Sequence, residues 1–162
     1  MEKPLILVVD DEPKMADNVA EIIKVTGKYD AIAAYSAKDA FNVFEKNKRY
    51  FGLANNRIRC IVLDIKMPEV DGLQFLKELR EKEPWFKIMP VIILTAYEDR
   101  TKWAKATSPL RGMIAAYLKK PPNEQELIDT LDRIFNGEIG HMIDEARKTK
   151  YEKWDQLKED EK

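Results

Sequence analysis

Short apolar runs alternate with longer amphipathic stretches along most of this chain. The apolar runs, rich in Val, Ile, Leu and Ala, predict β-strands at residues 5–9, 29–35, 60–64, 90–95 and 114–118. Apolar residues at helical spacing predict helices from Pro13 to Gly27, after a cap at Ser36, from Asp71 to Pro84, from Asp99 to Thr107, and from a cap at Asn123 to Gly137. Residues 46–59 are polar and basic, and we expect them to form a long loop.

This alternation of strands and helices predicts an α/β fold. Parallel strands joined by helical crossovers form a sheet that is covered on both faces. The expected architecture is a (βα)5 doubly wound, flavodoxin-like sheet in the order 2-1-3-4-5, formed by residues 1–136. Residues 137–162 are highly charged and carry one apolar stripe, so they predict an amphipathic helical tail; the stripe consists of Ile139, Ile143, Ala146, Trp154 and Leu157.

Composition narrows the classes of function. The chain has 162 residues, 44% of them hydrophobic, which fits one domain with a proper core. A formal net charge of -1 gives no reason to expect nucleic acid as a direct partner. The longest apolar run, residues 113–118, is too short for membrane insertion, and the N-terminus has no signal-peptide pattern. A single cysteine excludes an internal disulfide, and a cytoplasmic location is expected.

Reactive side chains follow four of the predicted strands. The first strand ends on Asp10 and Asp11, the third on Asp64, the fourth on Thr95, and the fifth leads to Lys120. Clustered carboxylates repel one another, and a hard divalent cation such as Mg²⁺ relieves that repulsion. An aspartate can also act as a nucleophile toward phosphorus, and a lysine and a hydroxyl can then stabilise the phosphoryl group. The pattern predicts a metal pocket built around one reactive aspartate.

Each of these residues also has a purely structural interpretation. Asp10 and Asp11 could cap the following helix, and for this pair alone the two interpretations are about equally weighted. Thr95 alone would be an ordinary β-branched strand residue. The basic side chains near the expected loop are predicted to be solvated, with a small anion-binding patch as the alternative; they are Lys48, Arg49, Arg57 and Arg59. The joint placement at four strand ends favours the functional interpretation.

The chain resembles the receiver domains of two-component response regulators. The resemblance covers roughly residues 4–136, and the matching segments are Val8–Pro13, Leu63–Gly72, Ile93–Ala96 and Tyr117–Pro121. It implies that Asp64 is the phospho-acceptor and that Mg²⁺ is held by Asp10, Asp11, Asp64 and the backbone carbonyl of Lys66. It also implies that Thr95 and Tyr117 are switch residues, that Lys120 contacts the phosphoryl group, and that the Lys120–Pro121 bond is cis.

The resemblance implies a signalling protein rather than an enzyme with a turnover substrate. A sensor histidine kinase or a histidine phosphotransfer protein would supply the phosphoryl group to Asp64. The altered surface would then be recognised by a downstream target protein, and a homodimer is a further expectation. The loop before the third strand is longer than in a typical receiver, and no output domain is expected in the tail.

Three alternatives stay open at this point. The chain could be the receiver part of a longer regulator, with the tail as the start of a signalling helix. It could be an aspartate-nucleophile phosphatase of the haloacid dehalogenase type, although Lys66 then stands where a second aspartate is expected. An FMN carrier is disfavoured because Asp10, Asp11 and Glu12 would repel a phosphate.

Overall fold

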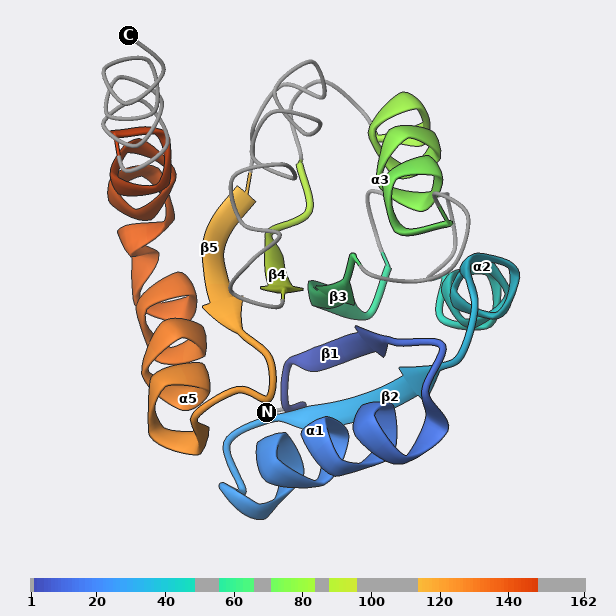
Figure 1. Ribbon diagram of the computed structural model, residues 1–162, viewed down its shortest axis with the longest axis horizontal. Coiled ribbons are helices and arrows are strands. Elements are labelled where there is room, and N and C mark those ends of the chain that lie inside the picture. Colours follow the sequence, from blue (N-terminus) through green and yellow to red (C-terminus); the bar gives the residue numbers. More distant parts are fainter. Residues whose placement is uncertain (1, 49–55, 66–70, 84–87, 96–113, 149–162) are drawn as a thin grey trace, which may run out of the picture.

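The computed structural model shows a parallel sheet with helices on both faces (Figure 1). It describes residues 2–48, 56–65, 71–83, 88–95 and 114–148. The strands are β1 (Leu5–Val9), β2 (Asp30–Ala34), β3 (Ile58–Asp64), β4 (Val91–Thr95) and β5 (Ile114–Lys119). The helices are α1 (Pro13–Val25), α2 (Ala37–Lys46), α3 (Asp71–Lys82), α5 (Glu124–Arg133) and the π-helical turn η5 (Ile134–Glu138). The helix expected from Asp99 to Thr107 lies outside the described residues.

The strand order is the one expected from the sequence. The sheet has five strands in the order β2-β1-β3-β4-β5, and all the pairings are parallel. β1 therefore lies between β2 and β3, and the chain crosses over β1 to begin β3. This crossover creates a switch point at the carboxyl ends of β1 and β3, where doubly wound sheets commonly bind their ligands.

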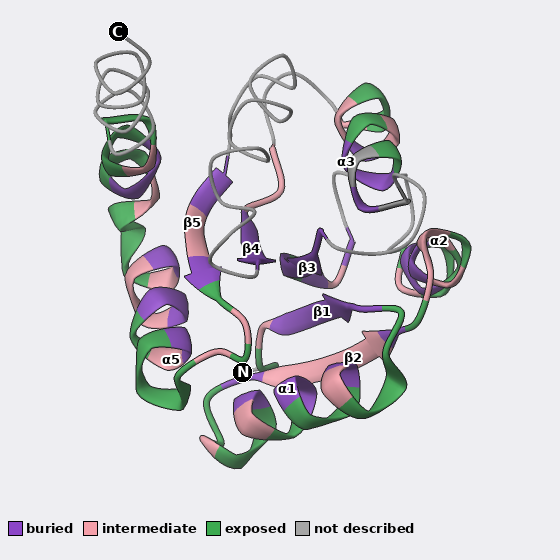
Figure 2. Cartoon of the chain, in the orientation of Figure 1, coloured by how far each residue is buried: buried purple, intermediate pink, exposed green. Residues whose placement is uncertain are grey.

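Alternate residues of β1 divide the core into two layers. Leu5, Leu7 and Val9 point to one face and pack with residues of α2 and α3. Ile6 and Val8 point to the other face and pack with α1 and α5. Figure 1 shows these two helical layers on opposite sides of the sheet, and Figure 2 shows that β1 and β3 are buried. Burial on both faces explains why these strands are almost wholly apolar in sequence.

The expected helix starts are confirmed by local contacts. α1 begins at Pro13, where a proline costs no helical hydrogen bond. The Ser36 hydroxyl accepts a hydrogen bond from the Asp39 amide at 3.0 Å and caps α2. The Asn123 side chain does the same for α5 by accepting from the Glu126 amide at 3.0 Å. These caps satisfy amides that would otherwise have no partner in the first helical turn.

The loop expected over residues 46–59 is shorter than the sequence indicated, because β3 begins at Ile58. The hydrogen bonds of Asn56 account for this earlier start of β3. The buried Asn56 side chain donates to the Phe44 carbonyl at 2.9 Å and accepts from the Ile58 amide at 3.0 Å. The neighbouring Arg57 amide donates to the Asn47 carbonyl at 3.0 Å. The end of α2 and the start of β3 are thereby joined directly.

Helical structure resumes after the expected stop at Gly137. Gly137 has a φ of 88°, a left-handed conformation that favours glycine, and it interrupts the helical backbone after α5. Residues 139–148 are again helical, which confirms a helical extension. Met142 of this segment is buried in the same core cluster as Leu131. No helix within the described ranges is long and apolar enough to cross a membrane.

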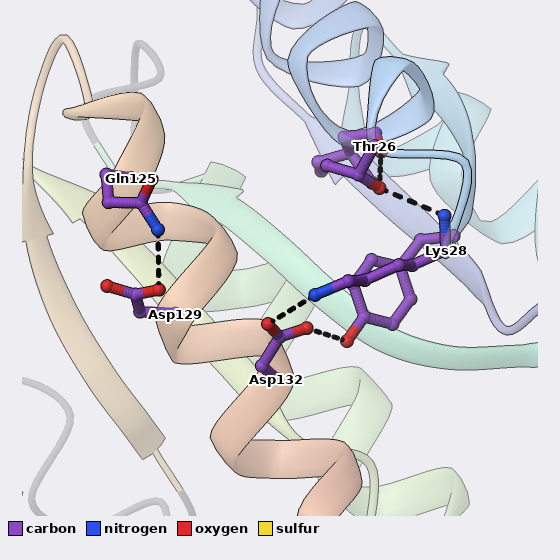
Figure 3. Close-up of polar contacts among 7 residues, drawn as sticks. Thr26, Lys28, Gln125, Asp129 and Asp132 are labelled. Carbon is purple, nitrogen blue, oxygen red and sulfur yellow. Dashed lines mark hydrogen bonds and ion pairs between the residues drawn. The ribbon is translucent and has the colours of Figure 1, made fainter.

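A polar contact ties α5 to the turn between α1 and β2 (Figure 3). Asp132 accepts hydrogen bonds from Lys28 Nζ at 2.8 Å and from the Tyr29 hydroxyl at 2.6 Å. The Tyr29 ring also lies 5.3 Å from the Phe135 ring, measured between centroids. The hydrogen bonds from Lys28 and Tyr29 lower the pKa of Asp132 below its usual value. The ionised carboxylate is therefore the form that stabilises this contact.

We predict that Asp132→Ala lowers the free energy of unfolding by about 1 kcal/mol at neutral pH, since charge-assisted hydrogen bonds at a partly exposed site are lost. A carboxylate with a lowered folded-state pKa contributes stability above its unfolded pKa, about 3.9. The difference in free energy of unfolding between Asp132→Ala and the unaltered protein should therefore shrink as the pH falls through the lowered folded-state pKa of Asp132. Urea unfolding across a pH series measures both effects.

Asp129→Ala is the matched control for this prediction. Asp129 lies in the same helix, is exposed, and among the described residues accepts a hydrogen bond only from Gln125, at 2.7 Å. The two substitutions share any change in helix propensity, so their difference isolates the contact with Lys28 and Tyr29. Equal destabilisation by both variants would contradict a stabilising role for Asp132.

Candidate functional site

Two adjacent strands bring Asp10 and Asp64 together. Val9 of β1 is paired with Leu63 of β3, so Asp10 and Asp64 follow at the same level of the sheet. Both side chains are buried, with 2% of Asp10 and 1% of Asp64 exposed. The Asp10 amide donates to the Ala34 carbonyl at 3.1 Å, and Asp10 Oδ1 accepts from the Glu12 amide at 2.9 Å. These contacts fix the turn between β1 and α1 and aim the Asp10 carboxylate.

Asp11 completes a group of three carboxylates. One oxygen from each of Asp10, Asp11 and Asp64 lies within 4.8 Å of the others. Opposite ligands of Mg²⁺ are separated by about 4.2 Å, since its bonds to oxygen are about 2.1 Å long. The spacing therefore fits the ion after a small adjustment. All three ligand atoms are carboxylate oxygens, which Mg²⁺ prefers, and Asp11 is exposed to solvent from which further ligands could come.

Lys120 places a positive charge inside this group. Its Nζ lies 2.9 Å from Asp10 Oδ2 and 2.9 Å from Asp64 Oδ2. Burial by itself lowers the pKa of Lys120, but the hydrogen bonds to Asp10 and Asp64 outweigh it, so the pKa is raised above the usual value. The ammonium is charged at neutral pH and offsets the repulsion between the two buried acids. The bond from Lys120 to Pro121 is cis, as the sequence resemblance implied.

Thr95 and Tyr117 come from the two strands beyond β3. Asp64 is paired with Leu94, so Thr95 lies one residue past the level of Asp64, and its side chain is fully buried. The Thr95 carbonyl accepts a hydrogen bond from the Lys120 amide at 2.9 Å, which joins the ends of β4 and β5. Tyr117 is paired with Ile93 and packs, partly buried, against the core layer of α2 and α3.

Not every residue named from the sequence falls within the described part of the chain. The carbonyl of Lys66, expected as a metal ligand, lies outside it. The structure brings together Asp10, Asp11, Asp64 and Lys120, with Thr95 at the neighbouring strand end. Cys60 was expected to be a core residue, and it is fully buried in β3. Burial raises the pKa of its thiol to about 12, so it is not a thiolate nucleophile at neutral pH.

Gly72 is a site residue whose role the sequence did not reveal. It lies in the first turn of α3, where the helix passes directly over the end of β3. A Cβ atom on Gly72 would lie 3.0 Å from the Asp64 carbonyl oxygen and 3.1 Å from the Ile65 Cα. Both neighbours are backbone atoms and cannot rotate away. Glycine is therefore required for α3 to begin this close to Asp64. The hints in the sequence were its position after a strand and turn and its place at the end of the matching segment Leu63–Gly72.

Comparisons with known proteins agree with this arrangement. The family model described as "Response regulator receiver domain" matches residues 6–132. The chain is similar to "Response regulator Rre1" of Synechocystis, with 32% identity over 131 residues that cover 79% of this chain and 51% of Rre1. It thus spans about half the length of that relative. It is also similar to a "Chemotaxis protein CheY homolog" of Campylobacter jejuni, with 25% identity over 83% of this chain and 95% of the relative.

Solved structures show the same fold. A putative response regulator from Chloroflexus aurantiacus matches with a TM-score of 0.65 and 26% identity, covering 82% of this chain and 98% of that one. The chemotaxis protein CheY4 of Vibrio cholerae matches with a TM-score of 0.63 and 24% identity, covering 82% and 98%. Because its identity is only 24%, the match to CheY4 bears on the fold alone. Both matches support the doubly wound architecture derived above.

We predict that Gly72→Ala destabilises the protein by about 1–3 kcal/mol, because the added methyl group overlaps backbone atoms. The amide signals of Asp64 and Ile65 should shift in an NMR spectrum, since these residues must move to make room. Gly140→Ala is the control, as a Cβ atom there meets nothing within 4 Å. Urea unfolding should show the control to be neutral or slightly stabilised. Similar behaviour of the two variants would contradict the close approach at Gly72.

We predict that Lys120→Gln tightens Mg²⁺ binding by roughly tenfold, since the competing ammonium is removed from between two carboxylates. Calorimetric titration of the variant with Mg²⁺ measures this effect. Lys119→Gln is the control because Lys119 is exposed at the end of β5. Unchanged or weaker Mg²⁺ binding in Lys120→Gln would show that the lysine and the ion do not share the acidic group.

Proposed function

The chain belongs to the response regulator receiver domain family, and we propose that it receives a phosphoryl group on Asp64 and thereby switches the proteins it binds. The observation that carries this proposal is the position of the Asp64 carboxylate. It lies buried at a strand end, among two further acids and within 2.9 Å of the Lys120 ammonium. A carboxylate in this position can attack phosphorus, while neighbouring cations offset the charge that arrives.

The transfer forms an oxygen–phosphorus bond at Asp64 and breaks either the oxygen–phosphorus bond of a small donor such as acetyl phosphate or the nitrogen–phosphorus bond of a phosphohistidine. An Asp64 oxygen forms the new bond to phosphorus, and the bond from phosphorus to the donor breaks, with its electron pair leaving on the donor. Asp10, Asp11 and Asp64 would hold Mg²⁺, with the Lys66 carbonyl as the further ligand implied by the family resemblance. The ion supplies positive charge that offsets the incoming phosphoryl oxygens.

Lys120 and Thr95 would stabilise the product. The Lys120 ammonium already contacts Asp64 and would pair with a phosphoryl oxygen, while the buried Thr95 hydroxyl at the next strand end would donate a hydrogen bond. A shift of Thr95 toward Asp64 frees space for the Tyr117 ring, which is only partly buried. In this proposal phosphorylation biases an equilibrium between two arrangements of β4 and β5 and so alters the surface that a partner meets.

The proposed partners follow from this chemistry. A sensor histidine kinase or a histidine phosphotransfer protein would supply the phosphoryl group, and a downstream target protein would recognise the switched surface. Homodimerisation through that surface and a cytoplasmic location belong to the same proposal, as does the division into a receiver domain (1–136) and a tail (137–162). Direct nucleic-acid binding is not part of it. Receiver domains are signalling proteins rather than enzymes with a turnover substrate.

We predict that Asp64→Asn abolishes phosphorylation by acetyl phosphate and Mg²⁺, because the amide is a far weaker nucleophile than the carboxylate. Intact-protein mass spectrometry measures the added phosphoryl group. Asp129→Asn, on the exposed surface of α5, is the control and should be phosphorylated as fast as the unaltered protein. Thr95→Ala should retain phosphorylation but lose the phosphorylation-dependent change in the NMR signal of Tyr117.

Two results would count against the proposal. Undiminished incorporation in Asp64→Asn would place the acceptor at another residue. Failure of the unaltered protein to accept a phosphoryl group from any small donor, while Mg²⁺ still binds, would show that the acidic group serves only to hold a metal. The second result separates loss of phosphoryl chemistry from loss of the metal site.

A further inference from the structure

A hollow lies at the edge of the sheet opposite Asp64, where the strands begin. Its volume is about 350 Å³, and it is bounded by the end of α2, the end of α3, the residues before β4 and the junction between α5 and the tail. Most of its lining is apolar, including Phe44, Leu79, Met89, Phe135 and Ile139. Arg59 and Asp64 are five residues apart on β3, which corresponds to about 16 Å along a strand. The hollow is therefore separate from the acidic group.

Arg59 lines this hollow and lies where the pairing of β3 with β1 is irregular. Leu5 of β1 is paired with Ile58, but the next residue, Ile6, is paired with Cys60. Arg59 is thus the extra residue that the pairing skips. Its side chain is exposed, whereas those of Ile58 and Cys60 are buried. Bulges often occur beside functional sites, where they redirect one side chain. Arg59, at this irregular pairing, is one of the residues that line the apolar hollow.

The other polar groups of the lining are already satisfied. The Glu83 carboxylate pairs with Arg80 at 2.9 Å and accepts a hydrogen bond from the Met89 amide at 2.8 Å. The Asn56 side chain is bonded to the backbone of Phe44 and Ile58. Arg59, in contrast, makes no ion pair with any residue that the structure describes, whereas the nearby Arg57 pairs with Glu2 and Asp30. The hollow therefore presents one positive charge beside an apolar surface.

We propose that this hollow binds a small amphipathic carboxylate, with its apolar chain against Leu79 and Phe135 and its carboxylate paired with Arg59. The volume is near the lower end of the range of about 300–1,000 Å³ for small-molecule sites, which suits a ligand of modest size. An apolar body with a single anionic end matches both the lining and its unpaired charge. A guanidinium also binds a carboxylate through two parallel hydrogen bonds, which fixes the orientation of the ligand.

Octanoate, below its micelle concentration, is the probe for this proposal. Titration of the full, unphosphorylated chain followed by NMR should give saturable shifts at the amides of Arg59, Met89 and Phe135. Octanol lacks the charge and acetate lacks the chain, so each should bind at least roughly tenfold more weakly. The measurement needs neither Mg²⁺ nor phosphorylation, so its outcome is independent of the function proposed for Asp64.

Variants separate the two parts of the site. Arg59→Gln should weaken octanoate binding by roughly tenfold and leave octanol unaffected, since only the charged contact is lost. Arg59→Lys, which keeps the charge, should bind octanoate more tightly than Arg59→Gln. Arg147→Gln, on the exposed side of the tail, is the control and should bind like the unaltered protein. Ile139→Trp should weaken octanoate and octanol alike by filling the hollow.

Three outcomes would overturn the proposal. The first is octanoate binding that does not saturate, and the second is binding whose shifts centre on residues away from the hollow. The third is equal octanoate affinity in Arg59→Gln and in the unaltered protein, which would mean that the carboxylate does not meet Arg59. Thermal unfolding of each variant confirms that a loss of binding is not a loss of fold.

Discussion

The central interaction of this protein is the contact of the Lys120 ammonium with the buried carboxylates of Asp10 and Asp64. Asp10 and Asp64 are adjacent because β1 and β3 are neighbours in the sheet, and like charges this close are costly when buried. The compensating charge comes from beyond β5, two strands away from β3. The long side chain of Lys120 spans the end of β4 to reach the carboxylates of Asp10 and Asp64. The site therefore depends on the sheet order, which places the two acids on adjacent strands and the lysine within reach of both.

One helical layer is held by a close contact at this edge of the sheet, and the other is held by a polar contact at the opposite edge. On one face, α3 starts so close to the end of β3 that only a glycine fits at position 72. On the other face, Asp132 of α5 holds Lys28 and Tyr29 at the turn before β2. In the proposed function, a change in charge at Asp64 would act first on the start of α3, which lies against the Asp64 backbone. The rigid surroundings favour a shift between discrete arrangements over a diffuse loosening.

The sequence predicted the features that depend on local pattern and strand ends. The alternation of apolar runs and amphipathic stretches was enough for a parallel sheet covered on both faces, and the flavodoxin-like fold supplied its strand order. With that order, the residues after each strand were enough for the group formed by Asp10, Asp11, Asp64 and Lys120. Features that depend on pairing register were not predictable. The start of β3 at Ile58 rests on hydrogen bonds of Asn56 to α2, and the exposure of Arg59 rests on a skipped pairing with β1. Neither the hydrogen bonds of Asn56 nor the skipped pairing at Arg59 produces a periodic pattern of apolar and polar residues in the sequence.

The direction of the helices matches the charges at the two ends of β3. Each described helix between strands begins at the carboxyl edge, so the partial positive charge of its amino end lies on the side of Asp10 and Asp64. The helices end at the other edge, where their carbonyl groups favour a cation such as Arg59. One strand, β3, therefore carries an acid at one end and a base at the other, each at the helix ends that favour its charge. The anion that Arg59 can accept must be held by direct pairing with the guanidinium and by the apolar wall, because the helix ends at this edge oppose it.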